Sequence, residues 1–443
     1  MLDDNNLFTI YLNNFREFKK TFIDIKPVNF FVGENSTGKT SIMYALKILT
    51  SDNFVPFPIA LDEHPLFIDG LPFELFSDIA NKEEALEIGI IIDDNVVLSS
   101  YKRDKDSAKL VHISFSYYQN LVSIDCVQWS VKIHQKTKKD FNDNAKIFKY
   151  LSDVTKKKSG YKKFSEDKLV QENYSEYINT TFNLTNIVFR LRNNPKLKDS
   201  SDKRDDYASS IDIFNFRNYF RYKQVWIDPI RAEPERVYLV NKKFSRKYAI
   251  PNKLKELEIN KTGEKVKIEI NKFGKSSTLF DQIIIKPFSE EQNSPYVINI
   301  AKENTSYSID SVGYGVSQIL PIVTELAIEN EDKSIFFIQQ PEVHLHPKAQ
   351  AYFGEYLFSK SRDISDGIFV IETHSDFVID RFRLMQKRSI AKVNAQILFF
   401  EKNKKGHNTV TSLSIDDNGR YPDDQPENFR GFFINEMMEL LEL

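Results

Sequence analysis

The sequence predicts an α/β fold in which a strand, a glycine-bounded loop and a helix form a phosphate-binding element. Two observations favour this class. A β-branched and aromatic run, Val28–Val32, leads into the loop, and a helix-like segment, Ile42–Leu49, follows it. Farther along the chain, the apolar runs Ser334–Ile338 and Gly367–Ile371 each end in polar residues before another helix-like segment. We therefore expect the chemistry of this chain at the ends of these strands.

Length and composition describe a globular protein of about two or three domain-sized units. The chain has 443 residues, of which 41% are apolar and 28% are charged. It has no run of about 18 apolar residues, and its first residues, Met1–Asn6, are acidic and polar, unlike a signal peptide. We expect a cytoplasmic protein without a membrane anchor. The net charge of −2 creates no overall field for nucleic acid.

Strands are expected on both sides of the phosphate-binding loop. Leu7–Leu12 and Thr21–Ile25 precede the loop, so we expect the nucleotide-binding sheet to begin at the start of the chain. Between Glu84 and His134, alternating segments separated by turn residues predict an antiparallel meander; these segments include Ala85–Ile92, Lys109–Tyr117 and Val127–Ile133.

The loop from Gly33 to Ser41 has the spacing of a phosphate-binding loop. Gly33 and Gly38 permit a tight turn that aims backbone N–H groups at a phosphate chain, and the following helix adds the positive end of its dipole. Lys39 would reach the β- and γ-phosphates, and the Thr40 hydroxyl would coordinate Mg²⁺. The candidate nucleotide-binding residues here are Gly33, Asn35, Ser36, Thr37, Gly38, Lys39, Thr40 and Ser41.

Residues 135–210 are rich in lysine with interleaved aromatic residues. Lysines such as Lys156, Lys157 and Lys158 could hold phosphates while the aromatic rings stack on bases. The alternative is a solvated helical face, because acidic residues dilute the positive charge. The polar stretch 193–206 is the best candidate for a mobile loop.

The segment after this region contains a rigid turn around Pro234. Arg231 and Arg236 flank two glutamates there, so the guanidinium groups either pair locally or point toward a phosphate. Residues 251–309 predict a helix followed by strands, namely Lys265–Ile270, Gln282–Pro287 and Tyr296–Ile300.

A second glycine-containing turn, Asp310–Gln318, opens onto a helix-like run. Because proline is best tolerated in the first turn of a helix, Pro321 indicates that these glycines lie at a helix amino terminus. Such a terminus is a second anion site.

The polar residues at the strand ends fit an ATPase. Gln339 and Gln340 end one strand, where the group that organises Mg²⁺ and the group that polarises water are expected. His374 follows the next strand and could reach the γ-phosphate. Pro347 is expected to start a helix that runs through Lys360.

Other chemistries fit the sequence less well. His344, His346 and His374 are compatible with a metal, but no cysteine or clear carboxylate partner accompanies them. The single cysteine, Cys126, excludes an internal disulfide framework, and we expect it to be a buried small apolar residue. No Gly-x-Ser-x-Gly elbow indicates a serine hydrolase.

Together these motifs carry a family resemblance. The order of the phosphate loop, Gly313–Gln318, Gln339–Pro347 and Glu372–Ser375 resembles the ABC/SMC-class ATPases, specifically the OLD-like AAA ATPases common in bacterial anti-phage and mobile-element loci. The likeness extends from end to end, since further stretches are also similar to that family, namely Ile227–Arg236, Asp417–Pro422 and Phe432–Phe433.

The resemblance implies a P-loop ATPase head of ABC/SMC type, with a mixed central sheet, an antiparallel β subdomain and a helical insertion. It implies ATP and Mg²⁺ as cofactors, Gln339, Gln340 and His374 as catalytic residues, and Thr40 and Gln339 as metal ligands. The signature element would act in trans through Gly313, Gly315, Ser317 and Gln318. Two heads would then enclose two ATP molecules, with ATP binding closing the dimer and hydrolysis releasing it.

Two positions depart from the family pattern. Gly313 takes the place of the usual signature serine, although Ser311 and Ser317 are near. Gln339 stands where the family usually has glutamate, and an amide brings no negative charge to Mg²⁺. We hypothesise that Gln339 is either an introduced trap or a natural change toward a nucleotide-binding switch, and Glu342 or Glu372 could compensate.

The expected domain order follows the resemblance. Residues 1–60 and 300–443 would form the discontinuous ATPase core, 61–134 the antiparallel β subdomain, 135–225 the lysine-rich, mainly helical insertion and 226–299 a connecting α+β segment. A last strand pair, 395–400 and 408–415, and a helix at 435–443 would end the chain. This leaves too few residues for the nuclease domain that OLD nucleases carry.

We expect a homodimer or higher oligomer that acts as an ATP-driven sensor or scaffold in phage defence, with a separate nuclease or toxin as effector and no membrane partner. A DNA-repair or recombination-type ATPase that clamps DNA is one alternative, and a catalytically silent nucleotide-binding scaffold is another. The long internal insertions do not suit a transporter motor.

Overall fold

The computed structural model describes residues 7–51, 84–92, 95–104, 107–117, 120–156, 162–163, 222–229, 231, 233–239, 246–259, 261–291, 293–329, 333–426, 428–429 and 431. The chain divides into two compact units. The first comprises residues 1–26, 34–222 and 400–410, and the second comprises residues 27–33, 223–399 and 411–443. The boundaries that the sequence suggested at residues 60, 134, 225 and 299 stay a prediction.

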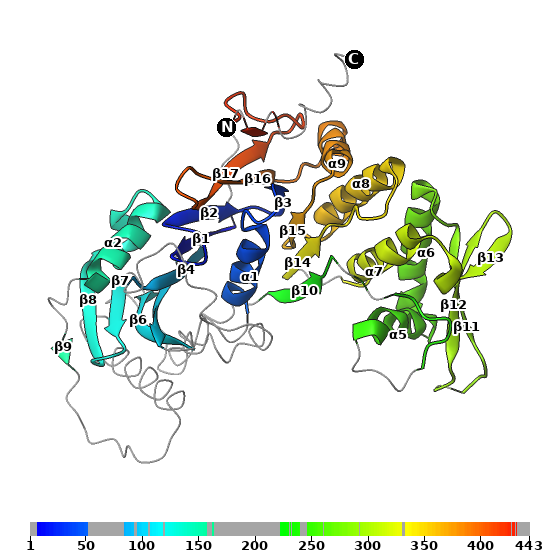
Figure 1. Ribbon diagram of the computed structural model, residues 1–443, viewed down its shortest axis with the longest axis horizontal. Helices are drawn as coiled ribbons and strands as arrows, with labels where there is room; N and C mark the ends of the chain where they lie inside the picture. The colour runs from blue at the N-terminus through cyan, green and yellow to red at the C-terminus, as the bar shows by residue number, and fades with distance from the viewer. Residues whose placement is uncertain are drawn as a thin grey trace, which may run out of the picture. The chain divides into compact units, whose positions relative to one another are not determined.

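The first unit contains an eight-stranded sheet in the order β2-β1-β4-β5-β6-β7-β8-β9 (Figure 1). Every neighbouring pair in this sheet is antiparallel, so the expected meander is confirmed. The strands are β1 (Phe8–Asn13), β2 (Thr21–Ile25), β4 (Leu86–Ile92), β5 (Asn95–Asp104), β6 (Ser107–Tyr117), β7 (Asn120–Asp125), β8 (Ser130–Thr137) and β9 (Lys162–Lys163).

The placement of the first two strands corrects the sequence-based expectation. We expected them to start the sheet that leads into the phosphate loop, but β1 lies between β2 and β4 in the antiparallel sheet. The short connection between β1 and β2 explains this, because a hairpin pairs its strands locally before any distant strand is available.

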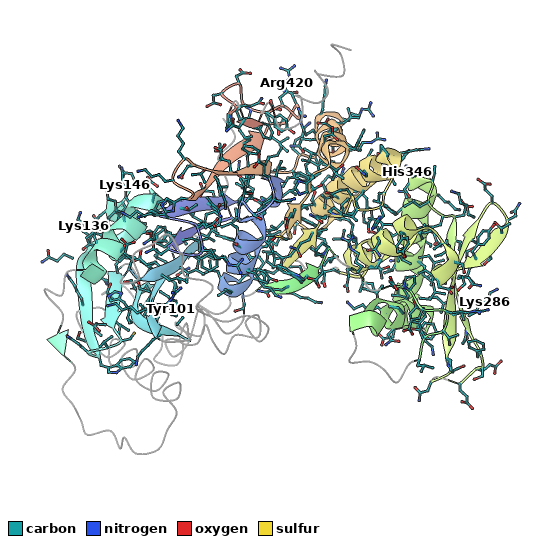
Figure 2. The ribbon with its side chains drawn as sticks, viewed as in Figure 1. Tyr101, Lys136, Lys146, Lys286, His346 and Arg420 are labelled. Carbon is teal, nitrogen blue, oxygen red and sulfur yellow. The ribbon has the colours of Figure 1, made fainter. Side chains whose placement is uncertain are left out.

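The described residues of the first unit include the helices α1 (Lys39–Leu49) and α2 (Asn144–Lys156). The aromatic rings of Tyr11 on β1 and Phe148 on α2 stack with their centroids 5.0 Å apart. The exposed side chains of Lys136 and Lys146 are labelled in Figure 2, and the Lys136 ammonium lies 5.5 Å from the centroid of the Tyr150 ring. Lys157, Lys158 and the stretch 193–206 lie outside the described residues, so the nucleic-acid interpretation of this region stays a prediction.

The second unit contains a six-stranded sheet in the order β10-β14-β15-β3-β16-β17. The pairs β10–β14, β14–β15 and β15–β3 are parallel, whereas β16 and β17 are joined by a short turn at residues 403–407. The strands are β10 (Lys223–Ile227), β14 (Ser334–Gln339), β15 (Ile368–Glu372), β3 (Val28–Gly33), β16 (Ala395–Lys402) and β17 (Asn408–Ile415). The expected α/β class with a mixed central sheet is confirmed.

Three of the parallel strands, β3, β14 and β15, are buried on both faces, as sheets covered by helices require. The Phe336 ring on β14 stacks on the Phe369 ring of β15 at a centroid distance of 4.8 Å. Phe382 on α9 contacts Phe30 on β3 edge to face at 5.2 Å. The helices that cover the sheet are α7 (Tyr314–Ile328), α8 (Pro347–Asp363) and α9 (Asp376–Arg388).

A smaller part of the second unit holds helices α5 (Arg246–Ile259) and α6 (Lys261–Ser277) and an antiparallel sheet of β11 (Gln282–Pro287), β12 (Tyr296–Lys302) and β13 (Thr305–Ser308). The expected strand at Lys265–Ile270 is wrong, because this stretch lies in α6. Val266, Ile270 and Phe273 are buried while Ile268 is 61% exposed. This spacing is that of a helix face, which a six-residue window did not separate from strand alternation.

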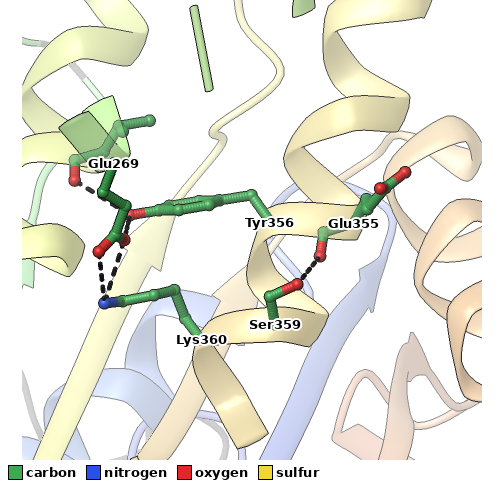
Figure 3. A network of polar contacts seen from close by, with 6 residues as sticks. Glu269, Glu355, Tyr356, Ser359 and Lys360 are labelled. Atoms are coloured by element: carbon green, nitrogen blue, oxygen red, sulfur yellow. Dashed lines mark hydrogen bonds and ion pairs between the residues drawn. The ribbon is translucent and has the colours of Figure 1, made fainter. Parts of the chain in front are cut away.

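A polar network joins α6 to α8 (Figure 3), in which Lys360 is buried and Glu269 is partly exposed. The Lys360 ammonium lies 3.1 Å from a Glu269 carboxylate oxygen, and the Tyr356 hydroxyl donates to the same carboxylate at 2.5 Å. Burial raises the pKa of Tyr356 far above its usual value, and the neighbouring Glu269 raises it further. No helix within the described part of the chain has the length and apolar character needed to cross a membrane.

Candidate nucleotide-binding site

The phosphate loop follows β3, and hydrogen bonds within the loop converge on the carbonyl of Glu34. The Lys39 ammonium and the Thr37 hydroxyl donate to this carbonyl at 2.7 and 2.8 Å. Gly38 caps α1 with φ at 93°, and a side chain there would meet Asn408 and Phe18 at 2.5 and 2.6 Å. Only glycine fits this left-handed position, so the loop needs Gly38 for its shape.

Arg16 is a neighbour of this loop that the motif analysis did not single out. It lies in the turn between β1 and β2 at φ 50°. Its guanidinium donates to the Ser41 hydroxyl oxygen at 2.8 Å and lies 6.0 Å from the centroid of the Tyr44 ring. The segment Asn13–Lys20 is polar in sequence, and polarity alone does not indicate that one of its residues contacts α1.

Residues from three parallel strands meet at the carboxyl edge of the central sheet. Gln339 ends β14 and Glu372 ends β15, and the two are in register. The Gln339 side-chain amide donates to a Glu372 carboxylate oxygen at 3.2 Å, and both residues are buried. On the other side of β15, Glu372 is in register with Phe31 of β3, the strand that continues into the phosphate loop.

Gln340 is held in a strained conformation beside this pair. Its φ is 45°, in the left-handed region that few residues other than glycine adopt. The Gln340 N–H donates to the Glu372 carbonyl at 2.7 Å. Strained backbone positions of this kind cluster at functional sites.

Arg231, four residues after the end of β10, supports the same turn. Its guanidinium donates to the carbonyls of Gln339 and Gln340 at 2.8 and 3.4 Å. The residue is 8% exposed, and its Nε and one terminal nitrogen have no hydrogen-bond partner among the described residues. Burial lowers the pKa of Arg231 to about 10, while the charges of Glu342 and Asp228 oppose this shift.

Glu342 anchors the segment that carries His374. Its two carboxylate oxygens accept from the Thr373 hydroxyl and from the His374 N–H, both at 2.8 Å. The His374 side chain is exposed. The structure therefore ties the turn after β14 to the turn after β15 through one carboxylate.

The second glycine-containing turn begins α7, as expected, with Gly313 as the capping residue. A side chain at Gly315 would lie 2.8 Å from the carbonyl oxygen of His344, whereas one at Gly313 would meet nothing within 4 Å. Pro321 lies inside α7 rather than in its first turn, so the expected first-turn position of this proline is wrong. Because proline has no backbone N–H, α7 lacks one internal hydrogen bond at this position.

Two of the three histidines considered as possible metal ligands make other contacts. His346, labelled in Figure 2, precedes α8, and its ring nitrogen Nδ1 accepts from the Ala349 N–H at 3.3 Å. The His344 ring lies 5.6 Å from the Tyr314 ring. The described residues include no group of three or more histidine, cysteine or acidic side chains that could hold a metal ion.

One protein of known name is similar to this chain over most of its length. Endonuclease GajA of Bacillus cereus (strain VD045) is 24% identical over 417 residues, which cover 87% of this chain and 58% of GajA. The chain thus spans less than two thirds of the length of this relative.

Solved structures of SMC heads are also similar, each at low identity. An SMC head bound to the C-winged helix domain of ScpA is 12% identical, with a TM-score of 0.42 and coverage of 92% of this chain and 97% of that one. The Smc head of Pyrococcus furiosus, bound to the C-terminal domain of ScpA, is 11% identical with a TM-score of 0.39 and 98% coverage of both chains. The SMC head of Thermotoga maritima is 10% identical with a TM-score of 0.35, covering 91% and 97%.

One family model matches most of the chain. The model described as an AAA ATPase domain matches residues 6–379, a range that includes the phosphate loop, the glycine-containing start of α7 and the ends of β14 and β15. The chain belongs to the AAA ATPase domain family.

Proposed function

We propose that this chain binds ATP with Mg²⁺, hydrolyses it, and forms a dimer in which two heads share the nucleotides. The observation that carries the proposal is the edge of parallel strands at which Gln339, Gln340 and Glu372 are fixed. This edge belongs to the same sheet as β3, the strand that leads into the phosphate loop.

In this proposal, different residues bind the phosphates, orient the attacking water and contact the γ-phosphate. Backbone N–H groups at the start of α1 and the Lys39 ammonium bind the phosphates. Gln340, held by Arg231 and by the Glu372 carbonyl, orients the attacking water. His374, on the segment anchored by Glu342, contacts the γ-phosphate. Preorganised donors of this kind stabilise the charge that develops during phosphoryl transfer.

The oxygen-rich donor set of the site fits Mg²⁺. The Thr40 hydroxyl is one candidate ligand. The Gln339 amide is another: its nitrogen donates to Glu372, which leaves its carbonyl oxygen as the acceptor. Mg²⁺ prefers oxygen ligands and keeps several waters, so few protein groups are needed. When bound, it neutralises charge on the phosphates.

The glycine-containing start of α7 would bind the nucleotide held by the partner subunit. Gly313 has open space around it, and Gly315, Ser317 and Gln318 follow in the first turns of α7. A helix amino terminus of this kind presents N–H groups to an anion. ATP binding would therefore close the dimer, and hydrolysis would open it.

A role in phage defence extends this proposal. The support is the OLD-like order of motifs together with the similarity to a protein named as an endonuclease. The chain would act as the sensor or scaffold, and a separate nuclease or toxin would be the effector.

A mixing experiment tests whether two heads share each site. Lys39→Ala removes phosphate binding, and Gly313→Arg places a bulky cation at the proposed shared surface. Each variant alone should lose turnover, whereas a mixture should recover part of it, because one site of the mixed dimer keeps both intact halves. Ile390→Arg, at a fully exposed position, is the matched surface control and should retain activity. A mixture that stays inactive while each variant remains folded contradicts sharing in trans.

A further inference from the structure

The site has amides at two positions where an ATPase is expected to use its acidic groups. Gln339 and Gln340 both end β14, and neither brings a negative charge to a metal–nucleotide complex. If the proposed function is correct, a carboxylate elsewhere on the same edge would supply the negative charge that the two amides lack.

Two carboxylates, those of Glu342 and Glu372, lie next to this turn, and they differ in the hydrogen bonds that they accept. Both oxygens of Glu342 accept hydrogen bonds at 2.8 Å, one from the Thr373 hydroxyl and one from the His374 N–H. Glu342 therefore holds the segment after β15 in place through both of its carboxylate oxygens. Displacing these bonds to bind a metal would release His374 from its position.

Glu372 is placed differently. It ends β15, the strand between β14 and β3, so its backbone is in register with Gln339 on one side and with Phe31 on the other. The Thr373 N–H donates to the Phe31 carbonyl at 3.2 Å, which holds the end of β15 against β3. In the order of the sheet, Glu372 is one strand closer to the phosphate-loop strand than Gln339 is.

The hydrogen bond between Gln339 and Glu372 joins an amide donor to a carboxylate acceptor. Gln339 donates through its nitrogen to one Glu372 oxygen, and a carboxylate can accept several bonds at once. A glutamate at position 339 would instead put two buried carboxylates side by side, which disfavours the ionisation of both. With Gln339 present, the pair contains a single carboxylate, and the hydrogen bond from the amide fixes its orientation.

We propose that Glu372 supplies the carboxylate toward Mg²⁺ in this site, and that Gln339 positions it. The negative charge expected on β14 is thus carried by β15. This inference rests on the proposed function, since it concerns the same nucleotide.

The test compares four chains: the unaltered protein, Glu372→Gln, Gln339→Glu and the double variant that exchanges the two residues. The exchanged pair keeps one carboxylate, one amide and their hydrogen bond, so it preserves folding. Two readouts are the affinity for a non-hydrolysable ATP analogue with and without Mg²⁺, and the paramagnetic signal of Mn²⁺ bound with that analogue. ATP turnover is a third readout.

Glu372→Gln should weaken the metal-dependent part of nucleotide affinity about tenfold or more and leave metal-free binding unchanged. The exchanged pair should recover most of this loss. Gln339→Glu alone should bring no gain in turnover. Glu329→Gln is the matched control, because Glu329 is another buried acid, paired with Lys223 at 3.0 Å, and its loss should not change the metal dependence.

Two results overturn the inference. If Glu372→Gln binds nucleotide with the same metal dependence as the unaltered chain, Glu372 has no role toward Mg²⁺. If turnover appears only in Gln339→Glu, position 339 is the true acidic site and the chain is a trapped form. A chain that binds no nucleotide at all would instead refute the proposed function itself.

Discussion

At the scale of single residues, the site depends on a few backbone positions whose surroundings differ sharply. Gly38 and Gly315 are packed so closely that a side chain would collide with neighbouring atoms, whereas Gly313 faces open space. Gln340 and His344 adopt positive φ values without being glycine. The turn after β14 is therefore held by its neighbours rather than by local preference.

The two glycines of α7 give a matched pair of substitutions. Gly313→Ser should change stability by less than about 1 kcal/mol, because serine is a favourable capping residue and the space is open. Gly315→Ser should destabilise by about 1–3 kcal/mol, since its side chain meets the His344 carbonyl. Thermal unfolding of both variants measures the difference. Equal midpoints would show that the approach of His344 to α7 does not constrain Gly315.

Arg231 gives a second prediction at this scale. Arg231→Lys keeps a positive charge but loses the planar fork that binds the carbonyls of Gln339 and Gln340. We expect turnover to fall about tenfold or more while nucleotide affinity stays within about twofold, because the turn that carries Gln340 loses its support. Steady-state kinetics and equilibrium binding separate the two effects. A parallel loss of affinity would indicate direct contact with nucleotide instead.

At the scale of elements, sequence patterns predicted the phosphate loop, the meander, α8 and the strands that end in Gln339 and Glu372. These elements can be predicted from local sequence, because the spacing of glycines, the alternation of apolar and polar residues and a proline at a helix start each involve only a few neighbouring residues. The patterns failed for Lys265–Ile270, where a short apolar alternation fits both a strand and α6. They also did not show the contacts of Arg16 or the pairing of Glu372 with Gln339, because these depend on which segments meet in space.

The network between α6 and α8 tests how these elements are held together. Glu269→Ala should destabilise the protein by about 1–3 kcal/mol, because it leaves the buried Lys360 ammonium without its partner. Adding Lys360→Met should restore part of the loss by removing the stranded charge. Denaturant unfolding of the single and double variants measures the coupling between the two residues. Additive effects of the two changes would contradict a buried ion pair.

At the scale of the whole molecule, family membership and the strand-end site both point to nucleotide chemistry. The AAA ATPase domain match extends from residue 6 to residue 379. What the sequence alone left open was which carboxylate serves a site that ends in two glutamines. We propose Glu372 for this role, since both carboxylate oxygens of Glu342 accept hydrogen bonds from Thr373 and His374.

The most direct test of this account is steady-state ATP hydrolysis by the full chain with Mg²⁺, with molecular mass measured in the same samples. The account predicts turnover that depends on Mg²⁺ and is lost in Lys39→Ala, and a mass that doubles when ATP is bound. ATP binding without turnover, and without any change in mass, would contradict it and identify a catalytically silent nucleotide-binding scaffold.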